Sequence, residues 1–128
     1  MTSAITGARE GLEASLTAQG LRVQDPAGQV SPPAVFLVPG DPWLAPTRLG
    51  PQVREVTYRV IGLVGLGVDT VQQSESELMA QRLADAIAAT QGPAWALISL
   101  DPPAEYDVGG VTYLAIVGST HTHLAGGS

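Results

Sequence analysis

The segment that decides the fold is EYDVGGVTYLAIV, which spans residues 105–117. Two segments of extended character, Glu105 to Val108 and Val111 to Val117, flank its Gly109-Gly110 link. A two-residue glycine link supplies the positive φ angles of a type I′ turn, and the twist of that turn matches the strands on either side. The sequence therefore predicts a long β-hairpin in the C-terminal part of the chain.

An amphipathic helix is predicted upstream of this hairpin. Its apolar stripe, which recurs at helical spacing, consists of Met79, Leu83, Ala86 and Ile87. Two capping boxes offer alternative starts for this helix, one at Thr70 and the other at Ser74. Gly92-Pro93 closes the segment, because proline cannot continue a helix.

Three further strands are predicted from runs of apolar or alternating residues. Residues 34–38 and 95–100 are apolar runs of strand length, and residues 52–64 alternate before becoming apolar on both faces. The stretch from Asp41 to Pro51, between the strands predicted at residues 34–38 and 52–64, contains three prolines and a tryptophan. We interpret that stretch as a long projecting loop.

The first residues of the chain predict a second helix. Its apolar stripe consists of Ile5, Ala8, Leu12 and Leu16. Gly20 follows the last periodic residue, where a left-handed backbone favours glycine, so the helix is expected to end near Gln19. A short strand over residues 21–23 is expected next.

Together these elements predict one domain over residues 1–128. The expected fold is α/β (α+β), with a mixed, mostly antiparallel sheet of about four to five strands, two helices packed on it and a long C-terminal β-hairpin. A chain of this length can bury about two-thirds of its unfolded surface, which is enough for a core without cysteines.

Composition and charge restrict the classes of function. The chain is 45% hydrophobic, which excludes a disordered protein, and its longest apolar run is nine residues, too short to cross a membrane. Twelve carboxylates oppose six arginines, for a net charge of -6. Because gripping nucleic-acid phosphates requires a basic patch, specific DNA or RNA binding is not expected.

Three patterns raise the alternative of a small nucleotide-binding or metal-binding enzyme domain. Glycines at 62, 65 and 67 follow a strand and precede a helix, yet their order departs from the dinucleotide fingerprint, so close packing by a neighbouring backbone competes with nucleotide binding. His121 and His123 would point the same way on a strand, but a third metal ligand is not evident nearby. Three carboxylates lie at 101, 105 and 107, on a turn and along a hairpin edge. We expect no catalytic residues, no metal and no cofactor.

The proline-rich stretch supplies the candidates for a protein interface. Trp43 on a proline-stiffened loop would lose little entropy on docking, and tryptophan is enriched in interface hot spots. The competing interpretation is that Trp43 folds back over the edge of the core. Arginine is favoured in interfaces because its planar fork pairs with carboxylates. The full candidate set is Trp43, Leu44, Arg48, Leu49, Arg54 and Arg59.

In order, these elements resemble the tail terminator proteins of long-tailed bacteriophages, particularly those that infect actinobacteria. The resemblance covers nearly the whole chain and rests on the N-terminal helix, the entry Pro32-Pro33-Ala34-Val35, the proline-rich stretch, the long strand, the central helix and the closing hairpin around Tyr106 to Leu114. Tail-completion and head-tail joining proteins of the neck have similar size and are the nearest alternative.

The resemblance implies a structural protein of the virion tail that is assembled in the host cytoplasm. Such a subunit would form a hexameric ring with copies of itself at the head-proximal end of the tail tube. The ring would bind the tail tube protein and the neck or connector proteins, and DNA would pass through it without specific binding. Acidic residues facing the channel would repel DNA during that passage.

Overall fold

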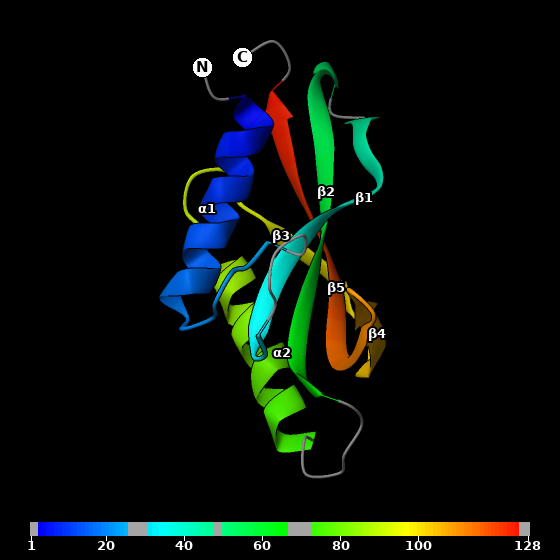
Figure 1. The fold of residues 1–128 in the computed structure, drawn as a ribbon. Coiled ribbons are helices and arrows are strands. Elements are labelled where there is room, and N and C mark those ends of the chain that lie inside the picture. Colours follow the sequence, from blue (N-terminus) through cyan, green and yellow to red (C-terminus); the bar gives the residue numbers. More distant parts are fainter. Residues whose placement is uncertain (1–2, 26–30, 48–49, 67–72, 126–128) are drawn as a thin grey trace.

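The computed structural model describes residues 3–25, 31–47, 50–66 and 73–125. Two helices and a mostly antiparallel five-stranded sheet form an α+β fold, as the sequence predicted (Figure 1). The elements are α1 (Ala4–Ala18), β1 (Ala34–Thr47), β2 (Gly50–Leu66), α2 (Gln73–Ala88), β3 (Ala96–Leu100), β4 (Ala104–Val108) and β5 (Val111–Ala125).

The sheet is built around two long central strands, β2 and β5. They pair antiparallel from Val53↔Ala125 to Leu66↔Tyr113, and the strand order is β1-β2-β5-β3. β3 and β4 follow one another along the other edge of β5, opposite its residues 118–121 and 111–115. Between them the Asp101 backbone N–H donates to the Val117 carbonyl at 2.8 Å, so these two short strands form one interrupted edge.

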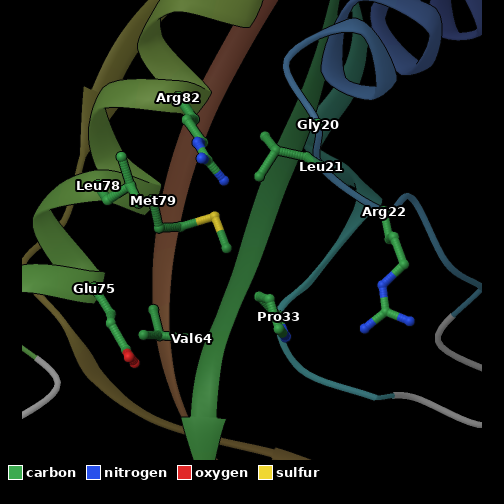
Figure 2. Close-up of a pocket in the computed structure, with 9 residues that line it drawn as sticks. All are labelled: Gly20, Leu21, Arg22, Pro33, Val64, Glu75, Leu78, Met79 and Arg82. Carbon is green, nitrogen blue, oxygen red and sulfur yellow. The ribbon is translucent and has the colours of Figure 1, made fainter.

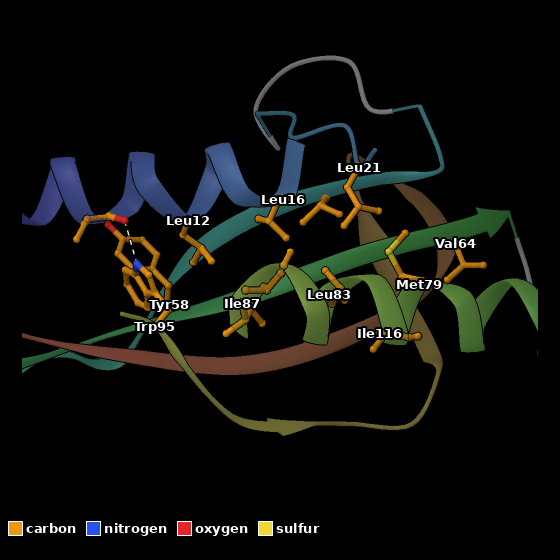
Figure 3. Close-up of a cluster of buried hydrophobic side chains, with 14 of the residues drawn as sticks. Leu12, Leu16, Leu21, Tyr58, Val64, Met79, Leu83, Ile87, Trp95 and Ile116 are labelled. Carbon is orange, nitrogen blue, oxygen red and sulfur yellow. Dashed lines mark hydrogen bonds between the residues drawn. The ribbon is translucent and has the colours of Figure 1, made fainter. Parts of the chain in front are cut away.

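The main core lies between the two helices and one face of the sheet (Figures 1 and 3). Leu12 and Leu16 of α1 and Leu83 of α2 are fully buried in it. Trp95, just before β3, is also buried, and its Nε1 donates a hydrogen bond of 2.9 Å to the Ala8 carbonyl of α1. This single side chain therefore joins α1 to the sheet.

A second, smaller core lies on the opposite face of the sheet. It contains Phe36, Ile61 and Leu63 together with residues of β5. Phe36 on β1 and Tyr106 on β4 come from opposite edges of the sheet, yet their ring centroids are 6.1 Å apart. The sheet therefore curls strongly enough for its two edges to enclose apolar side chains without a helix on that face.

The predicted start and end of α1 agree with the structure. Ser3 caps the helix, because its Oγ accepts the Thr6 backbone N–H at 3.0 Å. Gly20 has a φ of +82°, the left-handed conformation expected after the last turn. The short strand expected over residues 21–23 is reduced to a single parallel bridge between Val23 and Val35.

The glycine hairpin is confirmed. Gly109 and Gly110 have φ values of +58° and +82°, and Val108 pairs with Val111 across the two-residue link. The partner strand β4 is short, however, and most of β5 pairs with β2 instead.

The prediction of a projecting loop from Asp41 to Pro51 is wrong. β1 continues to Thr47 and β2 begins at Gly50, so most of this stretch is β-strand, and residues 44–47 pair with β2. Ladder pairing resumes at Leu44↔Val56 after a register shift that follows Pro39. The prolines suggested a loop because proline has no backbone N–H to donate to a neighbouring strand. They are tolerated here because β1 is an edge strand, and one side of its backbone has no neighbouring strand to bond.

The second helix begins at Gln73. Ser74 therefore lies in its first turn instead of capping it, and Thr70, the alternative start, lies outside the described residues. Of the helices described, neither has the length and apolar character that would let it cross a membrane.

Candidate interaction surfaces

The first candidate surface is the β1–β2 arm, formed by residues 41–47 and 50–57. It lies at one end of the molecule, whereas α2 begins near the other end (Figure 1). The Trp43 side chain is 44% exposed and Leu44 is 43% exposed. Large apolar side chains this open to solvent on an edge strand are typical of contact surfaces when they occur together.

The Trp43 ring packs against a row of other aromatic rings. Its ring meets Tyr58 edge-on, with 6.2 Å between centroids, and Tyr58 in turn meets Trp95 at 5.9 Å. Figure 3 shows Tyr58 and Trp95 side by side under α1. Trp43 therefore packs against the edge of the core, as one of the two interpretations expected, while its side chain stays partly exposed; its part in an interface remains a prediction.

The arginine candidates separate onto different faces. Arg54 is exposed and, by strand alternation, lies on the same face of β2 as Val56 and Tyr58. Arg59 is exposed on the opposite face. Arg48 and Leu49 lie outside the described residues. Of the predicted set, the structure brings Trp43, Leu44 and Arg54 to one side of the arm.

The second candidate surface was not predicted from the sequence. It is a groove of about 520 Å³ between α2 and the link that joins β3 to β4. We call it the α2 groove and define it by Ser76, Glu77, Ala80, Asp101, Leu114 and Ile116. Leu114 and Ile116 of β5 are buried apolar residues, whereas Glu77 and Asp101 are exposed carboxylates. The groove thus combines apolar and acidic side chains.

The buried hydroxyl group of Ser76, in the α2 groove, lowers the stability of the fold. The residue is only 4% exposed, and its Oγ makes no hydrogen bond in the described structure. A buried hydroxyl without a partner loses its hydration and gains nothing in return. We therefore expect Ser76→Ala to raise the free energy of unfolding by about 1 kcal/mol, measured by urea denaturation.

Ser74→Ala is the matched control, because Ser74 is exposed in the same helix and should change stability by less than about 0.5 kcal/mol. A clear loss of stability in Ser76→Ala would contradict the expectation and would show that this hydroxyl is paired in solution.

A smaller cavity of about 280 Å³ lies at the other side of α2 (Figure 2). Arg82 and Met79 extend from the helix toward Leu21, while Glu75 and Arg22 lie on opposite sides of the opening. Arg22 is engaged elsewhere, because its Nη2 donates to the Ser31 carbonyl at 3.1 Å. The described residues that line this cavity do not indicate a particular ligand.

The glycine pattern has a packing explanation. Gly62 lies inside β2, and a Cβ at this position would come within 2.9 Å of the Met79 side chain of α2. Gly65 lies at the register shift between β2 and β5. A dinucleotide fingerprint requires its glycines at the turn into the helix, so these two do not fit it. Gly67 lies outside the described residues.

The histidines lie together on β5, with ring centroids 5.3 Å apart. His123 Nε2 is 3.4 Å from Glu55 Oε2, on the neighbouring strand β2. Within residues 3–25, 31–47, 50–66 and 73–125, no three potential ligands are grouped closely enough to hold a metal ion.

The three clustered carboxylates diverge in the structure. Asp101 lines the α2 groove, and Glu105 and Asp107 are exposed on the edge strand β4. The Thr112 hydroxyl lies 2.6 Å from Asp107 Oδ1 and donates to it. Charges on an open strand edge oppose unwanted pairing with other strands. This structural role accounts for Glu105 and Asp107 without assigning them a part in metal binding or catalysis.

No model of a known protein family matches the chain, and no curated protein is significantly similar to it.

Proposed function

We propose that this chain is a structural subunit of a phage tail, of the tail terminator kind, that closes the head-proximal end of the tail tube as a ring. Its partners would be copies of itself in a hexamer, the tail tube protein and the neck or connector proteins. It would reside in the neck region of the virion tail and assemble in the host cytoplasm. The proposal begins from the order of elements along the chain.

The observation that carries the proposal is the presence of two unlike surfaces toward opposite ends of the molecule (Figure 1). The β1–β2 arm exposes Trp43 and Leu44, and the α2 groove offers an apolar floor with acidic edges. A closed ring requires heterologous contacts, in which each subunit uses one surface to bind a different surface of its neighbour. Two such surfaces on one chain are what a ring subunit needs.

The net charge supports the same role. At -6, the subunit would give a ring a strongly negative total charge, which disfavours binding of DNA to its walls. DNA could then pass through the channel without adhering to it.

The decisive experiment measures the length of tail tubes. Tube protein is polymerised with and without the purified chain, and lengths and ends are recorded by electron microscopy. We expect shorter tubes, each with one ring at one end only. Unchanged lengths together with bare tube ends would reject the proposal, while binding to the head connector without any effect on tubes would indicate a neck component instead.

A further inference from the structure

We propose that the β1–β2 arm of one copy docks into the α2 groove of the next copy, with Trp43 and Leu44 seated on the groove floor. The proposal rests on the function proposed above and specifies the contact that would hold the ring together.

The two surfaces match in apolar character. The arm presents an indole and an isobutyl group that are each more than two-fifths exposed. The groove floor is formed by Leu114 and Ile116, and its volume of about 520 Å³ has room for an aromatic side chain. Burying exposed aromatic anchors in a preformed apolar groove is the usual source of interface affinity.

Charge on the docking face of the arm also suits the groove. Arg54 is exposed on the face of β2 that carries the aromatic row, whereas Glu55 lies on the other face beside His123, and Asp41 stands at the start of the arm. The groove carries Glu77 and Asp101. In a protein with twice as many acids as bases, this pairing directs the arm toward the groove and away from other surfaces of a neighbouring copy.

Trp43 is already fixed in a docking position. Because its ring rests edge-on against Tyr58, which is buried, little side-chain freedom remains to be lost on binding. The contact also cannot be satisfied within one copy, since the arm and the start of α2 lie toward opposite ends of the molecule (Figure 1). Docking therefore proceeds from copy to copy, and it ends when the ring closes.

The experiment uses two variants of the full chain. Trp43→Ala removes the anchor but leaves the groove intact. Ala80→Trp fills the groove with an indole from its own helix but leaves the arm intact. We expect each variant alone to associate at least ten-fold more weakly than wild type by sedimentation velocity. An equimolar mixture should form dimers and nothing larger, because only one arm and one groove in each pair remain functional.

Control variants separate the contact from general effects on folding. Ala88→Trp adds the same indole at an exposed position of α2 outside the groove, and Arg59→Glu reverses a charge on the face opposite the arm's aromatic row. Both should associate like wild type. Should Ala80→Trp fail to fold, Glu77→Arg reverses an exposed groove charge and serves in its place, and circular dichroism checks each variant.

Each outcome bears on the docking independently of the proposed function. Variants that associate like wild type, a mixture that remains monomeric, or a wild-type chain that stays monomeric at millimolar concentration would each overturn the docking. Tube length reports on the function separately, so wild-type rings on tubes with no effect of these variants would overturn the docking alone. Mixed dimers without any effect of wild type on tubes would uphold the docking and reject the function.

Discussion

Replacing Trp95 with alanine is expected to lower the free energy of unfolding by about 3–5 kcal/mol, the usual cost of removing a buried tryptophan. Trp95 is 4% exposed, packs edge-on against Tyr58 and donates to the Ala8 carbonyl at 2.9 Å. The substitution would leave a cavity at the only point where a side chain of the sheet region is shown to hydrogen-bond to the backbone of α1 within the described residues. Equilibrium urea denaturation followed by circular dichroism measures the effect.

Trp95→Phe isolates the hydrogen bond from the packing. It keeps most of the apolar contact and should cost clearly less than the alanine substitution. A loss below about 1 kcal/mol in Trp95→Ala would contradict the expectation. Such a result would mean that α1 is anchored by its leucines alone.

Phe36→Ala is expected to cost a similar amount, about 3–5 kcal/mol, for a different physical reason. Phe36 is 1% exposed in the smaller core, where no helix covers the sheet. Its ring reaches Tyr106 of β4, so its removal would weaken the contact that brings the two edges of the curled sheet together. The change is measured by urea denaturation, and hydrogen exchange should show the largest loss of protection in β4.

Phe36→Leu provides the comparison for this prediction. Because leucine retains most of the apolar volume, its cost should stay below about 1.5 kcal/mol. If Phe36→Ala left β4 as well protected as in wild type, the second core would not be what holds that strand.

Local patterns predicted the parts of the fold that depend on local chemistry. The paired glycines 109 and 110 specify a turn by their own backbone freedom, and the stripe from Ala8 to Leu16 specifies the buried side of α1. The stretch from Asp41 to Pro51 could not be recognised as a hairpin, since its prolines are acceptable only on an edge strand. Which strand lies at an edge is a property of the assembled sheet.

The candidate surfaces divide in the same way. Trp43 and Arg54 could be selected as candidates because a tryptophan in a proline-rich stretch, followed by several arginines, is an unusual sequence pattern. The α2 groove was not, because its apolar floor comes from β5 while its rim comes from α2 and the β3–β4 link. Leu114 and Ile116 are ordinary strand residues in the sequence, and the groove beside them arises only from the spacing between α2 and the β3–β4 link in the folded chain.

The position of β5 in the sheet has a consequence for how the protein is made. β5 is the last of the described strands along the sequence, yet β2, β3 and β4 all pair with it. During synthesis those three strands leave the ribosome before their shared partner exists, so the nascent chain carries unpaired strand edges until β5 has emerged. Ribosomal stalling or premature termination before Val111 would release a fragment prone to aggregation, and chaperone demand should be greatest at that stage of translation.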